Sequence, residues 1–279
     1  MAHDRLARFL ERDHERIGEL GRTLVFDHGR RMPRAAVLLH GLTASPTQFA
    51  EFGRLLFARG YNVFVPRLPH HGHDDRLTDA LGRLTAEELE DLTRDCVEIA
   101  RGMGDSVRVV GFSLGGLLAA WAAQFLEIDA AVAVAPFLDL SWLPHRYAGP
   151  LATALLRFPN GFFWWDPFKR ERQMPAHGYP RYSTHAVAQC LRVARGVFDA
   201  ARQTAPRAAH VAFVLNASET TVRNRSARRL ARAWNAHRPG AASIFLLRDL
   251  PPSHDIIEPL RHPDIVERIY PVLLDLVDR

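Results

Sequence analysis

The chain has 279 residues, of which 47% are hydrophobic and 24% charged, proportions typical of globular proteins and not of disordered or fibrous ones. This length can bury one large core, so we expect a single α/β unit with an insertion and no second independent domain. The formal net charge of +5 comes from scattered arginines, because Lys169 is the only lysine. No zinc-finger spacing or basic motif interleaved with aromatic residues indicates a nucleic acid partner.

Cysteine content and hydropathy bear on the compartment. The two cysteines, Cys96 and Cys190, cannot form a disulfide framework and lie in no metal-binding spacing, as expected in a reducing compartment. The N-terminal residues lack an apolar run of signal-peptide length, and no segment approaches 18 uncharged apolar residues. We therefore expect a cytoplasmic protein without stable membrane insertion.

The first twenty residues predict an amphipathic helix. Its apolar residues at helical spacing are Leu6, Phe9, Leu10, Ile17 and Leu20. Its polar face mixes acidic and basic residues, which favours packing against the protein over binding a membrane surface. A short strand over residues 23–26 follows.

From residue 35 onward, strands and helices alternate. The expected strands are residues 35–39, 61–65, 107–110, 130–135, 211–215 and 243–247. The run at 35–39 is continuously apolar, as expected for a strand covered on both faces. This alternation predicts right-handed crossovers and a mostly parallel central sheet flanked by helices.

Local signals mark the helices between these strands. Ser45, Pro46 and Gln48 predict an N-cap, a first-turn proline and a capping box for a helix that ends at Gly60. A second capping box begins at Thr85. The residues of that helix expected to face inward are Leu89, Leu92, Cys96 and Ile99.

Two helices are expected near the C-terminus. Residues 223–232 are rich in arginine, and Leu230 and Trp234 lie one turn apart, which favours a helix with a solvated arginine face over an anion-binding patch. The last helix begins near Pro263, and Pro271 should kink or interrupt it.

The alternation stops between residues 139 and 208. This segment is too long for a plain loop and predicts a helical cap inserted between two parts of the core domain, 1–138 and 209–279. Its apolar residues are Trp142, Leu143, Leu151, Leu155, Leu156, Phe158, Phe162, Phe163, Trp164, Trp165, Phe168 and Tyr182. They can form the insertion's own core, an apolar lid over an acyl pocket, or both.

Residues 109–116, VVGFSLGG, place an apolar strand before Gly-x-Ser-x-Gly and a small-residue helix after it. This arrangement is typical of a nucleophile elbow, with Ser113 as the nucleophile. A sharp turn at the end of a central strand exposes the hydroxyl, and the close approach of strand and helix requires small neighbours such as Gly111 and Gly115.

A serine nucleophile needs a base and an acid, which for an elbow serine follow in the order acid, then histidine. His254 is the candidate base, because it follows the last expected strand in a proline-restricted loop. Glu219, after the strand at 211–215, is the favoured acid, and it could instead only stabilise a helix N-terminus. Asp139, after the preceding strand, is the rival acid.

Two backbone N–H groups are candidate oxyanion donors. One belongs to Leu114, directly after the proposed nucleophile, and the other to Leu42, in the loop after the strand at 35–39. Gly41 permits the close turn of that loop, and we expect His40 to hold the loop by hydrogen bonds and not to act as a base.

Residues 70–75, HHGHDD, have the composition of a metal site. Adjacent histidines in a loop after a strand rarely converge on one ion, so a structural loop is favoured and no metal or cofactor is expected.

The segments LLHGLTASPTQF, RLPHHGHD, VVGFSLGG, NASETTV and PPSHD together resemble the α/β-hydrolase superfamily, in particular its bacterial carboxylesterase and monoacylglycerol-lipase-like branch. The resemblance runs from residue 35 to the end, outside the insertion. It implies that Ser113 is the nucleophile, that His254 is the base, and that the N–H groups of Leu42 and Leu114 bind the oxyanion. The family acid is usually aspartate in an Asp-x-x-Val pattern, whereas this chain carries Glu219.

These features predict a cofactor-free serine esterase acting on a small-molecule ester, and the aromatic insertion favours medium or long acyl chains such as those of monoacylglycerols. Hydrolysis of thioesters, lactones or carbon–carbon bonds, acyl transfer, and ligand binding with little turnover remain alternatives. Dehalogenase and epoxide hydrolase chemistry is disfavoured, because those relatives carry aspartate at the position of Ser113.

Overall fold

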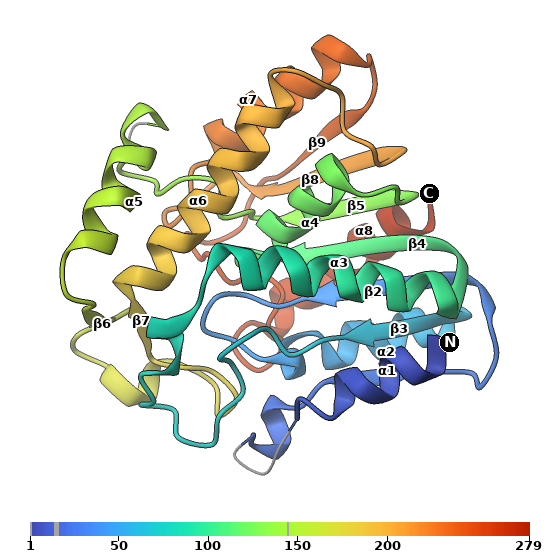
Figure 1. The fold of residues 1–279 in the computed structure, drawn as a ribbon, viewed down its shortest axis with the longest axis horizontal. Helices are drawn as coiled ribbons and strands as arrows, with labels where there is room; N and C mark the ends of the chain where they lie inside the picture. Colours follow the sequence, from blue (N-terminus) through green and yellow to red (C-terminus); the bar gives the residue numbers. More distant parts are fainter. Residues whose placement is uncertain (1, 14–16, 144) are drawn as a thin grey trace.

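The computed structural model describes residues 2–13, 17–143 and 145–279. A seven-stranded sheet runs through the centre in the order β1-β3-β2-β4-β5-β8-β9 (Figure 1). Strand β1 pairs antiparallel with β3, and every other neighbouring pair in this sheet is parallel. The strands are β1 Leu24–Phe26, β2 Met32–Leu39, β3 Tyr61–Val65, β4 Gly104–Phe112, β5 Ala130–Val134, β8 His210–Asn216 and β9 Ala242–Leu247. The α/β-hydrolase fold expected from the sequence is thereby confirmed.

Helices cover both faces of the sheet (Figure 1). The α-helices are α1 Ala2–Leu10, α2 Ala50–Ala58, α3 Ala86–Met103, α4 Leu114–Phe125, α5 Ala148–Arg157, α6 Thr184–Ala201, α7 Asn224–His237 and α8 Pro263–Asp278. In Figure 1, α3 and α4 lie in front of the sheet and α8 lies behind it. Helix α6 packs over α4, which is why α4 is apolar on all sides and buried from Leu114 to Gln124.

The strand ends converge on one edge of the sheet. Leu39 at the end of β2 lies opposite Gly111 of β4, and Phe112 lies opposite Val134 at the end of β5. The loops that follow parallel strands therefore leave the sheet side by side, which is where α/β proteins place their ligands.

One expected capping box is confirmed and the other is wrong. Thr85 accepts a hydrogen bond from the Glu88 N–H, and the Glu88 carboxylate accepts one from the Thr85 N–H. At Ser45 the chain enters a 3-10 turn, Pro46–Phe49, before α2 begins, and the side chain of Ser45 donates to the carbonyl of Leu20 instead. The expected partner, Gln48, accepts the N–H of Gly41.

The predicted N-terminal helix is shorter in the structure. Helix α1 ends at Leu10, so it does not extend over twenty residues. Ile17 is buried but forms an isolated bridge with His73, and Leu20 is largely exposed in a 3-10 turn, Glu19–Gly21. Part of the expected helix, residues 14–16, lies outside the described residues.

At the C-terminus, α8 continues through Pro271 without the expected interruption. Leu230 and Trp234 of the arginine-rich helix α7 are fully buried, and the arginines lie around its other sides. In the described part of the chain, no helix has the length and apolar character needed to cross a membrane.

The insertion has secondary structure of its own beside the sheet (Figure 1). It contains α5, α6 and a two-stranded antiparallel sheet of β6 Phe162–Trp164 and β7 Arg181–Ser183. Helices α5 and α6 pack against each other, and α6 also contacts α3, α4 and α7. The insertion is therefore held to the core mainly through α6.

Candidate active site

Ser113 lies in the sharp turn between β4 and α4, with φ of 54° and ψ of −110°. A non-glycine residue at positive φ costs on the order of 1–3 kcal/mol and persists only where its surroundings hold it. Here the Ser113 N–H donates to the carbonyl of Val134 and its carbonyl accepts from the N–H of Phe137, both at 2.9 Å. The end of β5 and the loop after it thus fix the turn.

Two glycines allow the close packing of this turn. A Cβ atom at Gly111 would overlap the carbonyl of Gly115, and a Cβ atom at Gly115 would overlap the carbonyl of Leu39. Both obstacles are backbone atoms, which cannot rotate away. The geometry of the elbow itself therefore requires glycine at both positions, two residues before and two residues after Ser113.

His254 reaches Ser113 from the loop that follows β9. Its Nε2 lies 2.8 Å from Ser113 Oγ, and its ring packs against Phe112 with centroids 5.0 Å apart. The loop is held by Asn216, whose side-chain amide donates to the carbonyls of Pro251 and Ser253, each at 2.9 Å. His254 is consequently fixed from the end of β8.

Glu219 lies behind His254, with its Oε2 2.8 Å from His254 Nδ1 and its side chain fully buried. Burial alone would raise the pKa of Glu219, but the hydrogen bond and charge of His254 and the N–H groups of Thr221 and Val222 outweigh it and lower the pKa. An ionised carboxylate only accepts, so Nδ1 carries the proton and Nε2 is free to accept the Ser113 hydroxyl.

Asp139, the rival acid, has other partners. Its Oδ2 accepts from the hydroxyl of Ser226 at 2.6 Å and lies 2.7 Å from Nδ1 of His145, which belongs to the insertion. Among the described residues, the carboxylate of Asp139 forms no hydrogen bond with His254. The geometry therefore favours Glu219 as the acid and places Asp139 at the root of the insertion.

The two candidate oxyanion donors lie on either side of the elbow. Leu114 is the first residue of α4, whose N–H has no partner within the helix, and Leu42 lies in the loop after β2. Within the described residues, neither N–H group donates to a protein acceptor. Leu42 also lines the cavity beside Ser113, so both groups stay candidate oxyanion donors.

His40 holds the loop after β2, as expected. Its Nδ1 lies 2.9 Å from the carbonyl of Gly41, and its Nε2 accepts the N–H of Leu68. Burial, reinforced by the neighbouring His71, lowers the pKa of His40 well below its ordinary value. A neutral, buried His40 with both nitrogens occupied is structural.

The histidines of the loop after β3 have separate partners. His70 pairs with Glu88, whereas Nε2 of His71 lies 2.5 Å from the carbonyl of Leu42. Burial lowers the pKa of His71 to about 4, so it is neutral and donates one N–H. No local pattern in the sequence predicts this contact with the loop after β2, because it joins two loops that are 29 residues apart.

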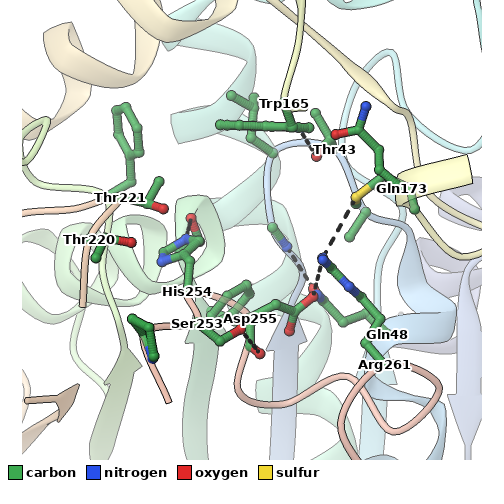
Figure 2. Close-up of a pocket in the computed structure, with 18 residues that line it drawn as sticks. Thr43, Gln48, Trp165, Gln173, Thr220, Thr221, Ser253, His254, Asp255 and Arg261 are labelled. Carbon is green, nitrogen blue, oxygen red and sulfur yellow. Dashed lines mark hydrogen bonds and ion pairs between the residues drawn. The ribbon is translucent and has the colours of Figure 1, made fainter. Parts of the chain in front are cut away.

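A cavity of about 310 Å³ opens beside Ser113 and His254 (Figure 2). Its polar lining is Thr43, Gln48, Gln173, Thr220, Thr221, Ser253, Asp255 and Arg261, and its larger apolar lining is Leu42, Phe112, Phe137, Trp165 and Met174. Arg261 and Asp255 form an ion pair of 3.7 Å at one side. The cavity has the size of a small ligand site and mixed polarity.

The aromatic residues of the insertion do not gather around this cavity. The insertion contributes Trp165, Gln173 and Met174 to the lining. Among its other described aromatic side chains, five are exposed, namely Trp142, Tyr147, Phe158, Phe163 and Phe168. Of the apolar residues that could form the insertion's own core or a lid over an acyl pocket, only Trp165 lines this cavity among the described residues.

A family model described as the alpha/beta hydrolase family matches residues 36–269. The chain belongs to the α/β-hydrolase family. The match includes Ser113, Glu219 and His254 and spans the insertion.

Individual proteins resemble this chain either over a short stretch of sequence or in fold at low sequence identity. A pyrethroid hydrolase of Sphingobium wenxiniae is 36% identical over 89 residues, which are 32% of this chain and 30% of that protein, so the match spans about a third of the relative's length. A monoacylglycerol lipase of Paleococcus ferrophilus aligns over 92% of this α/β hydrolase and 98% of its own chain, with 19% identity and a TM-score of 0.68. A monoglyceride lipase of Saccharomyces cerevisiae aligns over 92% and 90%, with 14% identity and the same TM-score.

Proposed function

We propose that this α/β hydrolase cleaves carboxylic esters through an acyl-enzyme on Ser113. The observation that carries the proposal is the position of His254, which lies 2.8 Å from Ser113 Oγ on one side and 2.8 Å from the buried Glu219 carboxylate on the other. A serine, histidine and carboxylate joined in this order form the arrangement that activates a hydroxyl nucleophile.

In the first half of the reaction, His254 Nε2 takes the proton of Ser113 as Oγ attacks the ester carbonyl carbon. The carbonyl oxygen becomes an oxyanion that accepts hydrogen bonds from the N–H groups of Leu42 and Leu114. When the tetrahedral intermediate collapses, the bond to the alcohol oxygen breaks and His254 protonates the leaving alcohol. Glu219 stabilises the transient imidazolium and keeps the ring oriented.

In the second half, a water molecule gives its proton to His254 and attacks the carbonyl of the acyl-enzyme. The same two N–H groups hold the second oxyanion, and its collapse returns the proton to Ser113 and releases a carboxylic acid. Every step uses only groups of the chain, the ester and water.

The relatives support an ester substrate. The curated relative is named a pyrethroid hydrolase, and two structural neighbours are named monoacylglycerol or monoglyceride lipases. We infer further that residues 139–208 act as a cap, since Trp165, Gln173 and Met174 of this segment close one side of the cavity.

The cavity bears on the length of the acyl chain. A volume of about 310 Å³ lies at the small end of the range for ligand pockets, and its walls alternate polar and apolar side chains. These properties favour short and medium acyl chains over the long chains suggested by the composition of the insertion.

A chain-length series tests both parts of the proposal. Purified protein would be assayed on p-nitrophenyl esters from acetyl to palmitoyl, beside Ser113→Ala, with fluorophosphonate labelling as an activity-independent readout. We expect a maximum of kcat/KM at short or medium chains, labelling of the native protein, and loss of both turnover and labelling in Ser113→Ala. Turnover by Ser113→Ala at the native rate would contradict the serine mechanism, and a maximum at palmitoyl would contradict the size argument.

A further inference from the structure

The loop after β2 carries Leu42, one of the two proposed oxyanion donors, and it lies between the core and the insertion. An oxyanion donor is useful only when its N–H is held where the charge develops, within a few tenths of an ångström. The contacts that fix this loop therefore bear on the rate of the reaction.

From the core side, the loop is held by His40, whose Nδ1 lies 2.9 Å from the carbonyl of Gly41, and by two further side chains. Gln48 accepts the N–H of Gly41 at 3.0 Å. Nε2 of His71 lies 2.5 Å from the carbonyl of Leu42, and its Nδ1 lies 2.7 Å from the carbonyl of Pro69. All three side chains are buried. Gln48 thus holds the peptide unit before Gly41, His40 the unit that carries the Leu42 N–H, and His71 the unit after Leu42. None of the three side chains is bonded to the hydroxyl of Thr43.

From the insertion, two groups hold Thr43. The indole N–H of Trp165 donates to the Thr43 hydroxyl at 3.0 Å, a contact visible at the top of Figure 2, and the N–H of Tyr179 donates to the Thr43 carbonyl at 2.7 Å. Thr43 itself is buried. The indole ring rests on Tyr182, with ring centroids 4.5 Å apart.

We propose that Trp165 is a positioning residue, which acts through the hydroxyl of Thr43 to hold the N–H of Leu42 in the oxyanion hole. This inference rests on the proposed ester hydrolysis and deepens it. The insertion thereby contributes to the chemical step, although no side chain in its described part is hydrogen-bonded to Ser113 or His254. Its docking on the core completes the oxyanion loop.

Trp165 also lines the cavity, so an experiment must distinguish its direct contact with the substrate from its effect on the position of the Leu42 N–H. A wall residue contacts the bound ester in the ground state and the transition state alike, and its loss raises KM. A residue that aligns an oxyanion donor acts mainly in the transition state, and its loss lowers kcat.

Four variants test the proposal on p-nitrophenyl butyrate. Thr43→Val removes the hydroxyl at constant shape, Trp165→Phe removes the indole N–H and keeps an aromatic wall, the double variant combines them, and Thr43→Ser keeps the hydroxyl. Trp142→Phe, a change of the same kind at an exposed tryptophan of the insertion, is the matched control. Rates are normalised to active sites titrated with a fluorophosphonate, so that misfolded protein is not counted.

We expect each single variant to lose about tenfold in kcat, below the 10²- to 10³-fold loss of a whole oxyanion donor, because His71 and Tyr179 still hold the loop. KM should change less than twofold. The double variant should also lose only about tenfold, since both changes break one contact, whereas independent effects would multiply to about a hundredfold. Thr43→Ser should restore most of the rate, and Trp142→Phe should match the native protein.

Affinity for a trifluoromethyl ketone gives a second readout, because its adduct with serine places an alkoxide in the oxyanion hole. Its Ki should rise in proportion to the loss of kcat/KM. Native kcat in Thr43→Val and Trp165→Phe, effects confined to KM, or multiplying losses would each overturn the inference while Ser113→Ala remained inactive. If Ser113→Ala kept the native rate, the proposed function itself would be wrong. Should Thr43→Val not fold, Trp165→Phe and Thr43→Ser decide the question.

Discussion

His254 Nδ1 lies 2.8 Å from Oε2 of Glu219, whose side chain has no exposed surface. The carboxylate is also held by the N–H groups of Thr221 and Val222, which lower its pKa together with His254 against the effect of burial. The family resemblance implies an aspartate as the acid, whereas this chain has a glutamate beside His254.

Replacing Glu219 by glutamine should lower kcat by about 10³- to 10⁴-fold, because a neutral amide can donate to His254 Nδ1 and favour the tautomer that cannot accept the Ser113 proton. The matched change, Asp139→Asn, should leave kcat within about twofold and lower the midpoint of urea unfolding, since it disturbs a buried carboxylate bonded to Ser226 and His145. Steady-state kinetics and urea titrations of both variants measure these effects. The reverse pattern of rates would move the acid to Asp139.

The elbow should not tolerate a methyl group at its glycines. Gly111→Ala places a Cβ against the carbonyl of Gly115, and the backbone can relieve this overlap only by deforming the turn at Ser113. We expect a loss of at least about 4 kcal/mol in the free energy of unfolding, or no folded protein. The control is Gly196→Ala in α6, where a Cβ would meet no atom within 4 Å and helix propensity favours alanine by roughly 1 kcal/mol. Thermal unfolding followed by circular dichroism compares the two, and equal melting temperatures would contradict the packing argument.

His71 should make the protein less stable in acid. Its pKa is about 4 in the folded state against an ordinary value of 6.5, so between these values the unfolded chain binds a proton that the folded chain refuses. The free energy of unfolding is therefore highest above pH 6.5 and falls as the pH drops toward 4. The contribution of this residue alone makes the free energy of unfolding roughly 2 kcal/mol lower at pH 5 than at pH 7.5.

The variant His71→Gln isolates this contribution. Its amide can still donate to the Leu42 carbonyl but does not titrate, so the loss of stability between pH 7.5 and pH 5 should be smaller by about 2 kcal/mol than in the native protein. Urea unfolding at the two pH values measures the difference. His237→Gln, at an exposed position of α7, should follow the native protein. An unchanged pH dependence in His71→Gln would show that His71 titrates normally.

Much of the fold was predictable because its signals are local. The apolar runs of β2 and β3, the capping box at Thr85 and the small residues around Ser113 each act within a few neighbouring positions. The sequence-based prediction was wrong where side chains of a local pattern form hydrogen bonds with residues distant in the sequence. Ser45 and Gln48 have the residue types of a capping box, but their side chains bond to Leu20 and Gly41 instead.

The candidate site likewise has some features that local sequence signals predict and others that depend on tertiary contacts. The sequence by itself determined the elbow at Ser113 and the chain order that singles out Glu219 and His254, because β-strands in an alternating pattern must deliver their following loops to one edge of the sheet. Only the tertiary structure decided that Asp139 pairs with His145, that among the described aromatic residues of the insertion Trp165 alone lines the cavity, and that Trp165 reaches Thr43 across 122 residues of sequence. The contact of Trp165 with Thr43 depends on how the insertion packs on the core, and no short stretch of sequence encodes the relative placement of two packed segments.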